Sequence, residues 1–159
     1  ETMLAKLTLI AAVAALALSP VAALANANPD WAARIKRIAV EVSIERDGAL
    51  RPAKVGDRLA KDDVVVTGAG SGAGLTFRDN SRVSVGPNAK LAIAKFVFEP
   101  GKTDDSVEMR TDLKKGLAAF VSGRVTKRKP GAMQVRTPSA ILGVRGTTFV
   151  ALTDVPLDK

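Results

Sequence analysis

The sequence has 159 residues, 47% of them hydrophobic, which is enough for one domain with a packed core. Its net charge of +8 favours anionic partners over cationic ones. Cysteine and histidine are absent, which excludes disulfides, thiolate or imidazole metal ligands, and every catalytic scheme based on either side chain.

Residues 1–25 have the three-part pattern of a secretory signal peptide. An apolar run over 7–18 is followed by the small-x-small site Ala23-Leu24-Ala25. We expect cleavage after Ala25, with Ala27 as a second site, and a periplasmic or secreted location in a bacterium. The alternative is an uncleaved membrane anchor, against which Pro20 and the alanine-rich run argue. Only that alternative predicts contact with a membrane.

Residues 26–37 are expected to be a lead-in to the domain. The segment 31–37 is compatible with one or two helical turns or with no regular structure, and Trp31 is expected to be a packing anchor rather than a platform for a ligand. From Ile38 to Glu45 apolar and polar residues alternate, which predicts a half-buried strand. Asp47-Gly48 predicts a hairpin turn, and Pro52 places the returning strand at a sheet edge.

Residues 55–98 alternate short β-prone runs with turn signals about every ten residues. The runs are Val64–Thr67, Leu75–Phe77, Arg82–Val85 and Leu91–Ile93. Asp62 and Asp63 are expected to be turn residues that accept backbone N–H bonds, rather than cation ligands. The glycine-rich segment 68–74 is expected to be a flexible hairpin, because it lacks the Lys and Ser/Thr of a phosphate loop. The whole pattern predicts an all-β domain of short strands and tight turns.

The chain beyond Phe98 begins with a polar loop and continues with further strands. The apolar run 117–121 predicts a buried strand, and the last strands are expected near Val135, at 140–144 and at 147–152. The densest basic block is TKRKPG, from Thr126. It is either a solvated turn or an anion-binding patch.

Several ordered motifs resemble those of the FecR domain. They are Gly56-Asp57, Thr67-Gly68, the run LTFRDNSRVSVGPNAKLAI from Leu75, Lys115-Gly116 and the run VRTPSAILGVRGTTFVA from Val135. The resemblance covers residues 55–151 of a domain expected to span 38–159, with Asn80 where the family usually has glycine. It implies an all-β, solenoid-like or sandwich-like domain in the periplasm.

The best-known members of that family sense an outer-membrane TonB-dependent receptor. They pass the signal through one transmembrane helix to a segment that controls a sigma factor. Few residues precede the apolar run here, so we expect a stand-alone exported FecR-domain protein. The alternative is the membrane-anchored sigma-factor regulator, truncated in this sequence.

We therefore expect a non-enzymatic, cofactor-free and metal-free binding domain whose partner is an envelope protein or an anionic glycan. Two surfaces are candidates for binding. The first is the turn Arg78, Asp79, Asn80 and Ser81, and the second is the basic group Lys127, Arg128 and Lys129. Nucleic acid is not expected, because the basic residues are spread out and aromatics, at 4%, are too few to stack on bases. The sequence leaves the oligomeric state open.

Overall fold

The computed structural model describes residues 30–102 and 106–153 and is built almost entirely of β-strands. The strands are β1 (Ala33–Ala39), β2 (Val42–Arg46), β3 (Ala49–Pro52), β4 (Arg58–Leu59), β5 (Val64–Thr67), β6 (Gly72–Phe77), β7 (Arg82–Val85), β8 (Lys90–Val97), β9 (Glu108–Val121), β10 (Met133–Arg136), β11 (Ile141–Val144) and β12 (Thr148–Thr153). A short helix, α1 (Arg124–Arg128), lies between β9 and β10. The predicted all-β class is confirmed. The predicted signal peptide and its cleavage site at Ala25 lie outside the described residues.

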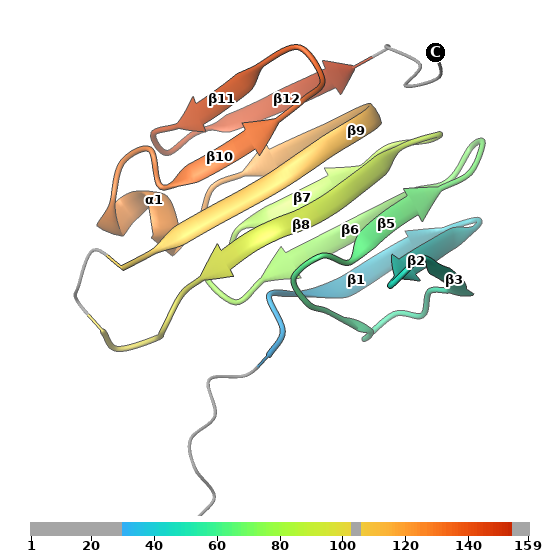
Figure 1. Cartoon of the computed structure of the whole chain (residues 1–159), viewed down its shortest axis with the longest axis horizontal. Coiled ribbons are helices and arrows are strands. Elements are labelled where there is room, and N and C mark those ends of the chain that lie inside the picture. The colour runs from blue at the N-terminus through green and yellow to red at the C-terminus, as the bar shows by residue number, and fades with distance from the viewer. Residues whose placement is uncertain (1–29, 103–105, 154–159) are drawn as a thin grey trace, which may run out of the picture.

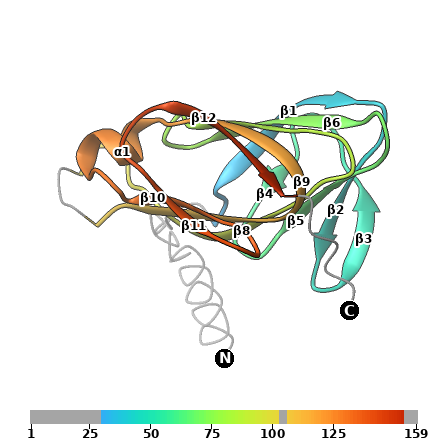
Figure 2. The ribbon, with the colours of Figure 1, turned by 90° about the horizontal axis from the view of Figure 1, so that it is seen from above.

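The strands form one sheet that curls over into two facing layers (Figure 2). Layer A has the strand order β4-β1-β6-β7-β9-β12. Layer B has the order β3-β2-β5-β8-β9-β10-β11. Among the described pairs, β9 with β10 alone is parallel. Two facing, mainly antiparallel layers correspond to the sandwich-like form of the prediction rather than to the solenoid-like form.

The long strand β9 (Figure 1) belongs to both layers. Its pairing changes from layer B to layer A at Gly116. Gly116 has a φ of +85°, and a Cβ atom there would lie 2.6 Å from the Cβ of Ala89. Only glycine combines that left-handed conformation with so close an approach. The Lys115-Gly116 motif therefore has a structural role in joining the two layers.

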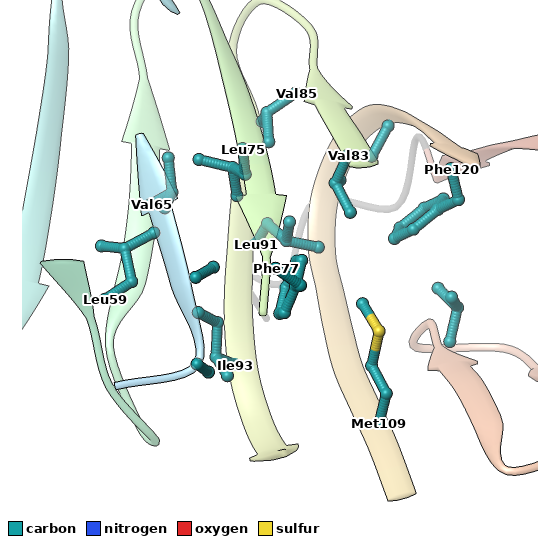
Figure 3. Packing of buried hydrophobic residues seen from close by; sticks show 14 of the residues in the cluster. Leu59, Val65, Leu75, Phe77, Val83, Val85, Leu91, Ile93, Met109 and Phe120 are labelled. Atoms are coloured by element: carbon teal, nitrogen blue, oxygen red, sulfur yellow. The ribbon is translucent and has the colours of Figure 1, made fainter. Parts of the chain in front are cut away.

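The hydrophobic core fills the space between the layers. Successive residues of a strand point to opposite faces, so the alternation in β6 and β7 sends every second side chain inward. Figure 3 shows Leu75, Phe77 and Val83 of layer A with Leu91 and Ile93 of layer B. These side chains are at most 2% exposed, so the core is well sealed despite the low aromatic content.

The first part of the domain corrects two predictions. The segment 31–37, expected to be helical or irregular, contributes β1 to layer A, so the domain includes part of the expected lead-in. A bulge at Lys36 breaks the alternation that would have revealed this strand. The strand expected over 38–45 is in fact the end of β1 and most of β2, in different layers. They are separated at Val40, where a φ of +64° turns the chain.

Three further elements differ from expectation in length or type. The hairpin expected over 68–74 is shorter, because β6 begins at Gly72. The strand expected at 117–121 is the last part of β9, which begins at Glu108. The basic block TKRKPG, expected to be a solvated turn or an anion-binding patch, starts inside the five-residue helix α1. Within residues 30–102 and 106–153, no helix has the length and apolar character needed to cross a membrane.

Candidate functional site

Trp31, the single tryptophan of the sequence, lies half-buried among three arginines. The guanidinium carbons of Arg34, Arg58 and Arg78 lie 5.5, 5.5 and 5.7 Å from the centroid of its ring. A guanidinium that packs on an aromatic ring is attracted by the ring's electrons. Arg78 also donates a hydrogen bond of 3.5 Å from Nη1 to the backbone carbonyl of Trp31. We call these four residues the Trp31 cluster.

Pairing between the strands of layer A places like charges next to one another. Arg34 of β1 lies directly opposite Arg58 of β4 on one side and opposite Thr76 of β6 on the other. Thr76 in turn lies opposite Arg82 of β7. Like charges directly opposite each other destabilise a sheet, so this row of cations lowers stability instead of raising it.

The strands of layer A, as far as the structure describes them, supply no carboxylate to offset this charge. The described strand residues of layer A, including 116–121 of β9, contain no acidic residue. In the described part of the chain, no ion pair is formed by Arg34, Lys36, Arg58 or Arg82. The positive charge on this side of the sandwich is therefore open to an anion from outside.

A pocket of about 350 Å³ opens beside Trp31. Its lining includes Arg34 and Lys36 of β1, and Arg78 and Asn80 from the turn between β6 and β7. The structure thus brings part of the turn predicted to bind a ligand next to arginines and a lysine that the sequence did not single out.

The other two residues of that turn have a structural role. Asp79 and Ser81 are completely buried. The carboxylate of Asp79 accepts hydrogen bonds from the Ser81 hydroxyl (2.6 Å), the Ser81 N–H (3.0 Å) and the Val125 N–H (3.2 Å). The Ser81 hydroxyl accepts a bond from the Gly123 N–H (2.9 Å). These bonds tie the turn to the start of α1, so ligand binding here stays a prediction for Arg78 and Asn80 alone.

The second predicted surface, Lys127 to Lys129, is divided between packing and solvent. The guanidinium of Arg128 lies 4.6 Å from the centroid of the Phe98 ring and donates a hydrogen bond of 2.9 Å to the carbonyl of Glu99. Arg128 therefore holds α1 against the end of β8. Lys127 and Lys129 are exposed on either side of it. Anion binding by these two lysines stays a prediction.

The acidic side chains near the strands fix turns. Asp63 is 1% exposed, accepts the Ala60 N–H at 2.7 Å and is held by both Nε and Nη2 of Arg46 at 2.6 Å. Its hydrogen bonds raise the pKa of Arg46, and the bond from Ala60 agrees with the turn role predicted for Asp63. Asp62 is exposed, and its carboxylate lies 3.7 Å from the ammonium of Lys61. Within the described residues, no group of three or more aspartates and glutamates is placed to hold a metal ion.

Asp57 of the Gly56-Asp57 motif fixes the turn between β3 and β4. Its carboxylate accepts the Lys54 N–H at 3.0 Å and the Arg51 guanidinium at 2.8 Å. The backbone bond from Lys54, followed by the bond from Arg51, lowers the pKa of Asp57. This motif therefore acts on the turn that delivers Arg58 to the Trp31 cluster.

Sequence reasoning missed most of the Trp31 cluster. It treated Trp31 as a packing anchor and did not consider Arg34 or Arg58. Arg34 and Arg58 are brought together by the pairing of β1 with β4, which are far apart in the sequence. No local sequence pattern reveals this contact. One signal was present in the sequence, since the strands now seen in layer A carry arginine and lysine without any acidic residue.

Comparison with known proteins places the chain in a family. The family model described as FecR protein matches residues 63–156, more than half of the sequence. No curated protein and no solved structure matches the chain. The match runs from the start of β5 through β12, so it includes the strands that form most of both layers and confirms the resemblance seen in the motifs. Members of this family regulate signalling in the cell envelope. This chain belongs to the FecR family.

Proposed function

We propose that this chain is a non-enzymatic binding domain of envelope signalling, exported to the periplasm, and that the Trp31 cluster is its site for an anionic ligand. Family membership supports the signalling role. The observation that carries the binding site is the facing pair Arg58 and Arg34, which both pack on Trp31 from adjacent strands of layer A. The described strand residues of this layer include no acidic residue.

The geometry suits a phosphate or carboxylate group. Guanidinium groups present planar forks of N–H donors that match such anions, and each hydrogen bond to a charged group contributes about 1.5–3 kcal/mol. Stacking on Trp31 restrains the arginines before the ligand arrives, so less side-chain entropy is lost on binding.

Binding at this site also provides a means of sensing. β4 has two residues and is held to layer A by its pairing with β1, where Arg58 faces Arg34. An anion between these arginines removes their repulsion and stabilises the pairing. An occupied site therefore holds the edge strand β4 more firmly against β1 than an empty site does. A signalling partner can detect this difference.

The fluorescence of Trp31 tests the site directly, because the sequence has one tryptophan and no tyrosine. We expect inorganic pyrophosphate to change this fluorescence saturably. The double variant Arg34→Gln/Arg58→Gln should weaken the affinity at least tenfold, or about 1.4 kcal/mol. The matched control Lys90→Gln/Lys115→Gln removes the same charge from an opposed pair of exposed lysines in layer B and should bind normally. An unsaturable signal, or equal losses in both variants, would rule out the site.

Export is supported by the apolar run over 7–18 and the Ala23-Leu24-Ala25 site. The intact mass and cell fraction of the full-length gene product test it. We expect a soluble periplasmic species that begins at Asn26. An uncleaved species in the inner membrane would instead favour the membrane-anchored sigma-factor regulator.

A further inference from the structure

The positive surface of layer A extends beyond the Trp31 cluster. A groove of about 430 Å³ crosses the outer face of β1, β6 and β7. Lys36 and Thr76 line both this groove and the pocket beside Trp31, so the two hollows adjoin. Figure 1 shows β6 lying between β1 and β7, which makes β6 the floor and its neighbours the walls.

Strand register explains the shape of the groove. Gly74 lies opposite Arg37 of β1 and Ser84 of β7, and paired residues share a face of the sheet. The outward positions of β6 are Gly72, Gly74 and Thr76, because Ala73, Leu75 and Phe77 point into the core. Two of the three outward positions therefore have no side chain, and the floor is sunk below its neighbours.

The walls supply positive charge. Lys36 and Arg37 come from β1 and Arg82 from β7, and all three are exposed. None of them forms an ion pair with any described carboxylate. From Thr76 to Gly72 the floor spans four residue-to-residue steps, roughly 13 Å at about 3.3 Å per step. This length exceeds what a single phosphate or carboxylate group can occupy.

We propose, on the basis of the function above, that the ligand is an acidic oligosaccharide that lies along this groove with one anionic group in the Trp31 cluster. Hydroxyl-rich sugar rings match a floor of glycine and threonine beside Ser84. Carboxylates or phosphates carried at intervals along the chain match the basic walls. The ligand is thus bound at several points along its length rather than at one.

Two other classes of polymer fit the groove less well. β6 is paired on both sides, so an acidic peptide cannot join the sheet there as an added strand. Single-stranded nucleic acid needs aromatic platforms for its bases. The lining of the groove contains no aromatic residue, and the ring of Trp31 is already packed against guanidinium groups.

Titration with galacturonate oligomers of increasing length tests the inference in the purified protein. We expect the affinity to rise at least tenfold from the monomer to the tetramer and then to level off. Arg37→Gln/Arg82→Gln should abolish this gain by removing charge from the walls. Ser84→Trp should abolish it by filling the space over Gly74 without a change in charge. Both variants should still bind pyrophosphate at the Trp31 cluster.

Matched controls separate the groove from general effects. Ala49→Trp adds the same bulk on the exposed edge strand β3, and Lys90→Gln/Lys115→Gln removes the same charge from layer B. Both should keep the full gain with length. A thermal melt of each variant shows whether it is folded, and the charge variant serves as the test if Ser84→Trp is not.

Three results would overturn the inference. The first is normal pyrophosphate binding with an affinity for galacturonate that does not depend on length, which leaves the proposed function intact. The second is a gain with length that survives both groove variants. The third is equal binding of oligoglutamate through the same residues, which would replace the glycan by an acidic peptide. Loss of pyrophosphate binding in Lys90→Gln/Lys115→Gln as well as in Arg34→Gln/Arg58→Gln would instead count against the proposed function.

Discussion

The two layers of the sandwich share one core but differ in the charged residues that their strands carry. The strands of layer B contain Glu45, Glu108 and Asp112 among their basic residues. Glu108 lies 2.6 Å from the ammonium of Lys95 and 3.7 Å from the guanidinium of Arg110. The described strand residues of layer A contain arginine and lysine and no acidic residue.

This difference in charge lies outside the hydrophobic core. Inward-facing side chains of both layers form one hydrophobic core, and the charged side chains of the outer faces lie outside it. Layer B offsets part of its charge with its own carboxylates, whereas the arginines and the lysine on the described strands of layer A form no ion pair with a described carboxylate. Charged residues on the outer face of layer A can therefore be replaced with little effect on folding. Variants of the two layers can then be compared directly.

The largest expected loss of stability is at Gly123, where the turn between β6 and β7 meets α1. A Cβ atom there would lie 2.4 Å from the carbonyl oxygen of Asp79 and from the nitrogen of Ser81, both backbone atoms. Gly123→Ala should lower the free energy of unfolding by about 3 kcal/mol through overpacking. Its melting temperature should fall by roughly 10 °C. Gly143→Ala, in layer B, is the control, because its added Cβ would meet no atom within 4 Å. Equal melting temperatures for the two variants would contradict the packing of this turn.

The next effect contrasts a paired charge with unpaired ones. Asp63 is buried and bound by Arg46 in layer B, so Asp63→Asn should lower the free energy of unfolding by about 2 kcal/mol. Arg34→Gln in layer A removes a charge that faces another arginine and should leave stability within about 0.5 kcal/mol. Urea unfolding measures both. If Arg34→Gln were the more damaging change, the charge of layer A would be structural.

A smaller effect is expected where the chain passes from layer A to layer B. Val40 is β-branched, has a φ of +64° and is 81% exposed, so it is strained without gaining burial. Val40→Asn should raise the free energy of unfolding by about 1 kcal/mol, because asparagine tolerates the left-handed region. Denaturant titration measures the gain. A lower stability in the variant would mean that Val40 makes a contact worth more than its strain.

The smallest effect depends on pH. The folded chain lowers the pKa of Asp57 below its ordinary value of 3.8, through the bonds from Lys54 and Arg51. The resulting stabilisation is present above the unfolded pKa and is lost as the pH falls through the lower folded pKa, that is, below about pH 4. Asp57→Asn should therefore lose stability less steeply than the parent between about pH 5 and pH 2. Parallel pH profiles from thermal melts would contradict this role.

Local patterns in the sequence predicted much of the fold and little of the site. The runs in 64–93 are bounded by Gly, Pro, Asn and Asp turns, so β5, β7 and their neighbours could be predicted from adjacent residues alone. The burial of Asp79 could not be predicted, because it depends on a contact with Gly123 far along the chain. The Trp31 cluster depends on the pairing of β1 with β4, which has no local signature, and the bulge at Lys36 interrupts the alternation of β1 itself.

The assignment of anion binding to layer A is tested most directly by two variants of equal net charge. In each, the affinity for pyrophosphate is read from the fluorescence of Trp31. Arg34→Gln/Arg58→Gln alters layer A, and Lys90→Gln/Lys115→Gln alters layer B. We expect an affinity at least tenfold weaker for the layer A variant and one within twofold of the parent for the layer B variant. Equal weakening in both would show that the protein attracts anions through its overall charge, and the assignment of binding to layer A would be wrong.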